Sequence, residues 1–148
     1  MSIKTIDSSE GILAKMIPAS EWAEGSQFYS EDRDALQVGT WDYAAGKKLG
    51  PHIHNEVARS IHQTGEVIFI YYGSIKASIY DSQERLVEEL ELHQGDILIL
   101  LAGGHGYEIL EDGTRVIEIK NGPYLGAEID RRIIGTGTGR LTHLNKNI

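Results

Sequence analysis

Apolar and polar residues alternate over short stretches in the middle of the chain, and turn-forming residues separate these stretches. Residues 36–43, 66–72 and 75–80 are rich in β-branched and aromatic side chains, which favour strands. Residues 75–80 alternate strictly, which predicts one buried face and one solvated face. Residues 97–101 are almost wholly apolar, which predicts a strand buried on both faces.

Three further strands are predicted. They span residues 86–92, 105–110 and 115–120. Successive strands lie about 8–12 residues apart with glycine-rich or acidic turns between them, a spacing typical of an antiparallel sandwich or barrel. We therefore expect a single all-β domain, with residues 1–35 as an N-terminal extension, 36–125 as the barrel and 126–148 as a C-terminal tail.

Composition narrows the class of protein. A chain of 148 residues can bury a substantial core. Its formal net charge of −8 disfavours a nucleic-acid surface, because phosphate binding needs a positive patch. The chain has no cysteine, so disulfides and thiolate metal ligands are excluded. We expect a cytoplasmic protein that contacts neither nucleic acid nor membrane, since no apolar run reaches the about 18 residues that span a bilayer and residues 1–7 lack the apolar start of a signal peptide.

Two histidines stand two residues apart after a glycine- and proline-containing turn. His52 and His54 follow Gly50-Pro51, and in an extended segment the side chains at i and i+2 point to the same face. We expect the two imidazoles to converge, as two ligands of one metal ion must. A third histidine, His105, follows a second glycine break at Gly103-Gly104.

These positions resemble the two sequence motifs of the cupin superfamily. The matching residues are Gly46, His52, His54, Glu66 and Gly73 for the first motif, and Gly95, Asp96, Gly103 and His105 for the second. Three departures stand out: the eleven-residue gap between His54 and Glu66 is longer than is usual in the family, Leu101 replaces a proline, and Ile109 replaces an asparagine. The resemblance covers residues 36–120. It implies a double-stranded β-helix, that is, a jelly-roll barrel, which is often dimeric and carries its site in the mouth.

A narrower likeness concerns small bacterial cupins that are associated with surface-polysaccharide genes. The residues that carry it are Arg59, Thr64, Gly103 to Gly106, and Lys120 to Tyr124. This likeness implies a role in carbohydrate metabolism and a sugar-derived substrate.

The cupin resemblance implies one divalent transition metal held by four side chains, those of His52, His54, Glu66 and His105. Three neutral imidazoles and one carboxylate suit Fe, Mn, Ni, Zn or Cu and leave coordination positions for water or substrate. The carboxylate ligand has two competitors. Glu56 shares the strand parity of His54, and His62 lies inside the long gap.

Strand parity and charge suggest which residues contact a substrate. The candidates are Arg59, His62, Tyr72, Tyr107 and Lys120. Arg59 would bind an anionic group. Glu118 and Lys120 share one face of their strand; facing inward they would form an acid–base couple, and facing outward an ordinary surface pair. We favour the outward placement.

We expect an enzyme that acts on a small polar substrate by Lewis-acid or acid–base chemistry, such as isomerisation, epimerisation or a lyase reaction. A metal-free variant would use a histidine–tyrosine acid–base pair. The alternative from another class is a non-enzymatic module that binds a small ligand, since one fold hosts many functions. Sandwich edges need covering, and we expect a homodimer or the N-terminal residues to cover them.

Overall fold

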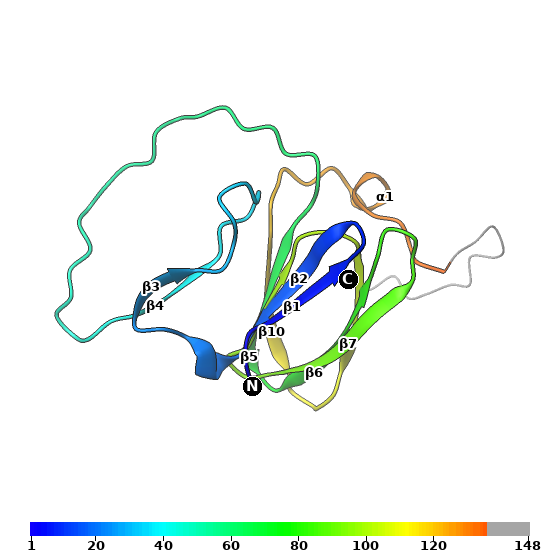
Figure 1. The fold of residues 1–148 in the computed structure, drawn as a ribbon, viewed down its shortest axis with the longest axis horizontal. Helices are drawn as coiled ribbons and strands as arrows, with labels where there is room; N and C mark the ends of the chain where they lie inside the picture. Colours follow the sequence, from blue (N-terminus) through cyan, green and yellow to red (C-terminus); the bar gives the residue numbers. More distant parts are fainter. Residues whose placement is uncertain (136–148) are drawn as a thin grey trace.

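The computed structural model describes residues 1–135, which form antiparallel sheets with little helix (Figure 1). The largest sheet has five strands in the order β1-β2-β8-β5-β10. Their bounds are Lys4–Ser8 (β1), Gly11–Ile17 (β2), Ile97–Leu100 (β8), Glu66–Tyr72 (β5) and Arg115–Lys120 (β10). A three-stranded sheet has the order β7-β6-β9. Its strands are Leu86–His93 (β7), Ser74–Tyr80 (β6) and Gly104–Ile109 (β9). The expected all-β fold is confirmed.

The remaining elements are short. Strands β3 (Gly25–Phe28) and β4 (Gly39–Asp42) form a separate two-stranded sheet. A 3-10 helix, η1, spans Ala19–Glu21, and a one-turn α-helix, α1, spans Ala127–Asp130. The C-terminal tail expected over 126–148 therefore begins with a helical turn, and its last residues, 136–148, lie outside the described part of the chain. No helix within residues 1–135 is long and apolar enough to cross a membrane.

The two larger sheets pack their apolar faces against each other. Ile68 and Leu98 come from the five-stranded sheet, and Ile75, Ile79 and Leu92 come from the three-stranded sheet. All five side chains are at most 2% exposed. Burying a side chain of this size contributes about 1.5–3 kcal/mol, so this interface supplies much of the stability of the fold.

The outer face of the five-stranded sheet is also covered. Val67, Ile97 and Ile99 pack there against Tyr29, whose hydroxyl lies 2.9 Å from Thr40 Oγ1 in β4. The loop between β3 and β4 thus lies over this face. Every residue of β8 is buried, which confirms the prediction of a strand buried on both faces.

The first 35 residues contribute to the central sheet. Strand β2 pairs with β8, with Met16 opposite Leu98, and β1 extends the sheet beyond it. The Asp96 carboxylate accepts hydrogen bonds from the backbone N–H groups of Ala19 and His93, at 2.9 and 2.8 Å. The segment that the sequence suggested to be an extension is therefore part of the core, and the Gly95-Asp96 turn holds it in place.

The sandwich is closed along one side and open along the other. On the closed side β1 lies beside β7, where Lys4 Nζ is 3.0 Å from Glu88 Oε2. On the open side β9 and β10 each end their sheet and do not pair with each other. No closed barrel is found among the described residues.

A long segment projects from the open side. Residues 43–64, which we call the arm, leave β4, run in a wide arc away from the sheets and return to the start of β5 (Figure 1). All 22 residues of the arm are exposed, and none is in a strand or helix. The strand expected over 36–43 is reduced to the four residues of β4, because the chain leaves the sandwich at Tyr43.

Candidate functional site

A group of polar side chains lies between the two sheets on the open side. The register of β5 and β10 places Lys120 opposite Glu66, and Glu118 opposite Ile68. Ile68 is buried in the core between the sheets, and directly opposite residues share a face. Glu118 and Lys120 therefore face inward, which corrects the outward placement that we favoured. The cause is tertiary, because the inner space at this end is open to solvent and tolerates charge.

Strand β9 supplies the other wall. His105 pairs with Ile79, and Tyr107 pairs with Ala77; Ile79 and Ala77 belong to the core. The imidazole and the phenol therefore face inward as well, with ring centroids 5.3 Å apart. We call the space bounded by Glu66, His105, Tyr107, Glu118 and Lys120 the mouth.

A glycine fixes where β9 begins. Gly103 has a φ of +73°, and a Cβ at this position would lie 2.1 Å from the backbone oxygen of Tyr80. Only glycine accepts this conformation and this close approach at low cost. The tight contact with β6 sets the position of His105, two residues later.

The most direct contact across the mouth joins β5 to β9. His105 Nε2 lies 2.9 Å from Glu66 Oε2. Glu66 Oε2 is buried but accepts no hydrogen bond of regular geometry from residues 1–135, so the contact is close without being aligned. Lys120 Nζ lies 3.6 Å from Glu66 Oε1 and 3.4 Å from Glu118 Oε1. The mouth is thus a compact set of opposed charges.

These contacts set the charge states. The His105 imidazole has the largest influence on the pKa of Glu66 and lowers it; burial opposes this, and Lys120 adds to it. Desolvation lowers the pKa of Lys120, but Glu118 and Glu66 outweigh it, so that pKa is raised overall. Desolvation raises the pKa of Tyr107, and the charges of Glu66 and Glu118 raise it further. At neutral pH the mouth therefore holds a carboxylate, an ammonium group and a protonated phenol.

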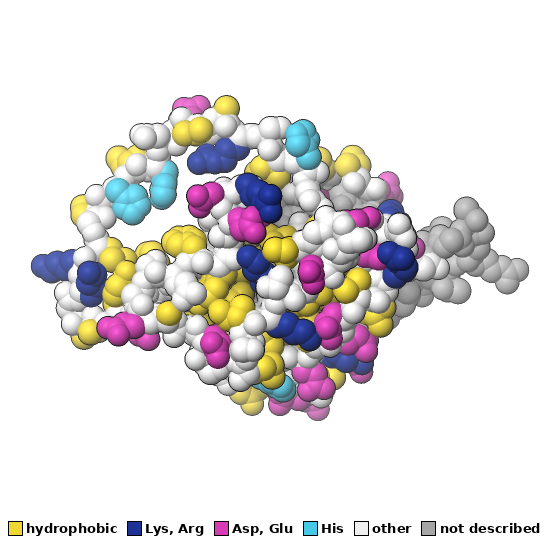
Figure 2. Space-filling model, viewed as in Figure 1, with side chains coloured by type: hydrophobic (Ala, Val, Ile, Leu, Met, Phe, Trp, Pro, Cys, Tyr) yellow, Lys and Arg dark blue, Asp and Glu magenta, His cyan; other side chains and the backbone are white. Residues whose placement is uncertain are grey.

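The histidine pair lies elsewhere. His52 and His54 sit in the arm, where their ring centroids are 5.0 Å apart in an edge-to-face arrangement. His52 Nδ1 is 3.2 Å from the backbone oxygen of Gly50. The two imidazoles are neighbours, but the structure places them apart from Glu66 and His105. In Figure 2 the arm carries its histidines across open space from the body of the molecule.

The four side chains expected to bind metal therefore form two separate pairs. Within residues 1–135, no group of three or more His, Cys, Asp or Glu side chains is placed to hold a metal ion. The imidazole and carboxylate of the mouth are suitable donors, and the buried Glu66 oxygen has unused acceptor capacity. The arrangement supplies part of a ligand set, and metal binding stays a prediction.

Three other candidates also lie outside the mouth. In the exposed arm, Arg59 Nη1 donates to the backbone oxygen of Val57 at 3.3 Å, and His62 Nε2 is 3.0 Å from Ser60 Oγ. Tyr72 lies six residues along β5 from Glu66, roughly 20 Å away in an extended strand. Glu56, the alternative carboxylate ligand, is likewise in the arm and exposed.

One residue near the mouth has a structural role that the sequence analysis did not predict. The Asn121 side chain follows β10 and accepts a hydrogen bond from the Gly65 N–H at 2.7 Å. Its amide nitrogen lies 3.4 Å from the backbone oxygen of Gln63. Asn121 thereby fixes the point where the arm rejoins β5. A polar residue directly after a predicted strand was the available signal, but its partner is far away in sequence.

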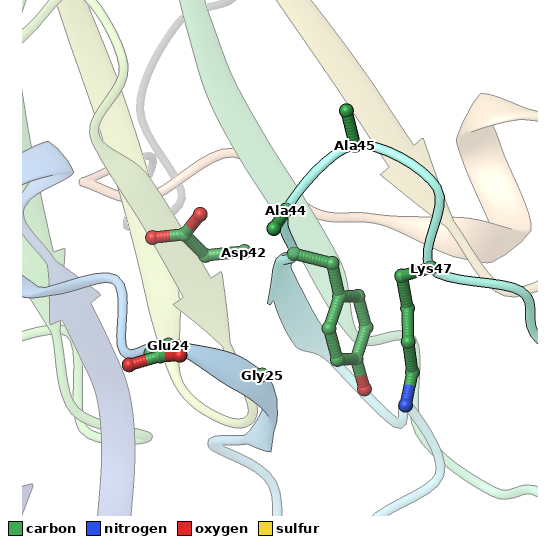
Figure 3. A pocket seen from close by; sticks show the side chains of 7 residues that line it. Glu24, Gly25, Asp42, Ala44, Ala45 and Lys47 are labelled. Atoms are coloured by element: carbon green, nitrogen blue, oxygen red, sulfur yellow. The ribbon is translucent and has the colours of Figure 1, made fainter.

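One depression on the surface lies away from the mouth, at the base of the arm. It has a volume of about 500 Å³ and is lined by Glu24, Gly25, Asp42, Tyr43, Ala44, Ala45 and Lys47. Figure 3 shows the Lys47 side chain directed away from the carboxylates of Glu24 and Asp42; its Nζ lies 5.4 Å from the Tyr43 ring centroid. The depression is shallow, and its charged groups do not converge. The mouth is the better candidate for chemistry.

Comparisons with known proteins give no family for this chain: no protein-family model, curated protein or solved structure matches it.

Proposed function

We propose that the protein is an enzyme that moves protons on a small polar substrate bound in the mouth. The single observation that carries this is the contact between His105 and Glu66 with Tyr107 beside it, all on the inward face of the sandwich. An imidazole can accept a proton from a substrate, and a nearby protonated phenol can donate one.

In an isomerisation or epimerisation, each residue of the mouth would have a distinct role. His105 Nδ1 forms no hydrogen bond within residues 1–135, so it can take the proton from a carbon next to a carbonyl group. The carboxylate of Glu66 stabilises the imidazolium that forms. Tyr107, which stands beside His105 on the same face of β9, donates its proton to the carbonyl oxygen, and the reverse of both transfers at the neighbouring carbon and oxygen restores the two side chains. Lys120 orients an anionic or carbonyl oxygen. One proton enters and one leaves, so no oxidant is needed.

The cupin assignment and the jelly-roll architecture belong to this proposal. Two antiparallel sheets face each other, and Glu66 and His105, one from each cupin-like motif, meet between them. The motif glycine Gly73 has a φ of +83°, and a Cβ there would lie 2.3 Å from Thr114 Oγ1, so its conformation requires glycine. These features support the family, and the sugar-derived substrate rests on the narrower likeness to the polysaccharide-associated group. A homodimer and a cytoplasmic location stay predictions.

Metal binding in the mouth is a second candidate. It is favoured by the buried Glu66 Oε2 atom, which has no aligned hydrogen bond although His105 Nε2 lies 2.9 Å away. Two donors this close suit neighbouring positions on one ion. Glu66 and His105 would hold a divalent transition metal, which would act as a Lewis acid towards a carbonyl or hydroxyl oxygen. Lys120 would then bind the far end of the substrate.

Hydrogen exchange into substrates tests the first candidate. Keto-sugars and their phosphate esters are incubated with the protein in D₂O, and proton NMR follows loss of the signal next to the carbonyl. We expect protein-dependent exchange that His105→Gln reduces at least about a hundredfold, the usual contribution of a general base. His93→Gln, at an exposed histidine of β7, is the matched control and retains exchange. If ligands bind but never exchange, the protein is a binding module.

Elemental analysis separates the two candidates. Protein purified without added metal is analysed, then titrated with Zn²⁺, Mn²⁺, Ni²⁺ and Fe²⁺. Binding near one equivalent that is lost in Glu66→Gln supports the metal site. Less than roughly a tenth of an equivalent, with no uptake, removes the metal candidate and leaves the acid–base chemistry intact.

A further inference from the structure

One inward carboxylate is not needed for the proposed proton transfers. Glu118 lies opposite Ile68 in the register of β10 and β5 and therefore faces the mouth, where 50% of its side chain is exposed. Among the groups that act on the pKa of Glu66, His105 has the largest effect and Glu118 the smallest, which places the two carboxyl groups close together. Glu118 therefore adds negative charge where a substrate would bind.

The lysine of the mouth is already shared between carboxylates. Lys120 Nζ lies 3.6 Å from Glu66 Oε1 and 3.4 Å from Glu118 Oε1. Desolvation lowers the pKa of Lys120, and these two carboxylates raise it; Asp130, a third carboxylate within range, raises it further. Within residues 1–135, no other lysine or arginine forms an ion pair with Glu66 or Glu118. The ammonium group of Lys120 therefore has little capacity left for an anionic group on a substrate.

The charges of the mouth do not balance. With the His105 imidazole neutral, as the base of the proposed reaction must be, the two inward carboxylates outnumber the single ammonium group. Asp130 adds a further negative charge nearby. Arg59, which we expected to bind an anion, lies in the exposed arm. A surplus of carboxylates between two protein walls repels anions and attracts cations.

A buried acceptor in the mouth also lacks a partner. Glu66 is only 8% exposed, and its Oε2 atom accepts no hydrogen bond of regular geometry within residues 1–135. A buried acceptor in this state is costly, and a donor group on a ligand removes the cost. Ionised carboxylates only accept hydrogen bonds, so the mouth favours a ligand that is rich in O–H and N–H donors.

We propose that the substrate of the mouth is a small sugar or polyol that carries a primary ammonium group, and that Glu118 binds this group and disfavours phosphate esters. An ammonium group has three donors and no acceptor, so it balances the surplus charge while hydroxyl groups donate to the other carboxylate oxygens. Lys120 then contacts the carbonyl oxygen of the substrate. The inference rests on the proposed function, since it names the substrate class for the same site, but binding tests it separately from catalysis.

Three matched polyols test the preference without any reaction. Sorbitol is neutral, glucamine replaces one of its hydroxyl groups by an ammonium group, and sorbitol phosphate is an anion. None has a carbonyl group, so the proposed chemistry cannot act on them. NMR titration with a chelator present gives each dissociation constant. We expect glucamine to bind about tenfold more tightly than sorbitol, the gain from a partly exposed charge-assisted hydrogen bond, and sorbitol phosphate to bind more weakly. Equal binding of glucamine and sorbitol, tighter binding of the phosphate, or no binding of glucamine overturns the proposal.

Two substitutions that change the charge equally locate the preference. Glu118→Gln should abolish the advantage of glucamine over sorbitol, because an amide cannot form an ion pair with the ammonium group. Glu108→Gln is the matched control: this carboxylate is 60% exposed on the outer face of β9, 2.6 Å from Lys76 Nζ. The control should keep the advantage. An equal loss in both variants would assign the preference to the net charge of the chain and overturn the role of Glu118.

Binding and catalysis can fail separately, and D₂O exchange distinguishes the two failures. Preferential binding of glucamine that depends on Glu118, with no hydrogen exchange into amino-keto sugars, supports the substrate class and removes the proposed proton transfer. Exchange into neutral or phosphorylated keto-sugars, with no preference for glucamine, keeps the enzyme and overturns the substrate class. Both a preference for glucamine and faster exchange into the amino-keto sugar than into its phosphate ester support the two proposals together.

Discussion

The closed and open sides of the sandwich are built from the same kinds of residue, but their side chains are buried to very different extents. On the closed side β1 and β7 lie together, and core residues such as Met16 and Leu92 are at most 1% exposed. On the open side every residue of β10 is exposed, although Val116, Ile117 and Ile119 are apolar. The same alternation of residues builds a buried core on one side and leaves apolar side chains exposed on the other.

This difference assigns most of the stability to the closed side and the candidate chemistry to the open side. Apolar burial stabilises the fold on the closed side, where the Lys4–Glu88 pair is partly exposed, whereas the open side holds Glu66, Glu118 and Lys120 between the sheets and close to solvent. Charged groups are costly to bury fully, and a substrate needs access to them. Three predictions test this division, in order of decreasing effect.

The largest effect is expected in the core. Leu98→Ala removes a fully buried side chain between the sheets and should lower the free energy of unfolding by about 2–5 kcal/mol. Ile119→Ala in β10, at a side chain 54% exposed, should cost less than about 1 kcal/mol. Urea unfolding measures both. A similar cost for the two variants would mean that another part of the protein covers β10 in solution.

An intermediate effect is expected where β9 starts. Gly103→Ala forces a Cβ against the Tyr80 backbone and imposes a φ of +73° on alanine, so we expect a loss of about 1–3 kcal/mol. Gly106→Ala, three residues later with free space around its Cα, is the control and should change stability by less than about 1 kcal/mol. Thermal or urea unfolding compares them. Equal losses would show that the approach to Tyr80 does not fix β9.

The smallest effect should depend on pH. Because the pKa of Glu66 is lowered in the folded state, its ionised form stabilises the fold above the unfolded pKa of about 4.5. That contribution disappears as the pH falls through the lowered folded value. Glu66→Gln should therefore be less stable than the parent by about 1 kcal/mol at pH 7, and the gap should shrink below pH 4.5.

The control for this comparison is Glu91→Gln, at a largely exposed carboxylate of β7. It should leave the free energy of unfolding almost unchanged at pH 7. A gap between Glu66→Gln and the parent that stays constant across the acid range would contradict the role assigned to His105 in lowering the pKa of Glu66.

Much of the strand pattern could be predicted from local sequence. Residues 75–80 and 97–100 behave as their alternation and apolar run predict, because side-chain burial in a strand follows a period of two. Strands β1 and β2 were missed because their short sequences carry little periodicity; they become strands by pairing with each other and with β8. The strand expected over 36–43 was only partly confirmed, because β4 pairs with β3 over Gly39–Asp42 alone.

By itself, the sequence determined the all-β class, the positions of the turns and the identity of four of the five residues that meet in the mouth: Glu66, His105, Tyr107 and Lys120. Glu66 and His105 were named by the resemblance of their motifs to those of cupins, and Tyr107 and Lys120 by parity and charge along their strands, which are local properties. The tertiary structure decided that Glu118 and Lys120 face inward, that residues 1–17 complete the core, and that His52 and His54 lie apart in the arm. Those outcomes depend on which strands pair across long stretches of chain, and the local sequence pattern does not indicate such pairing.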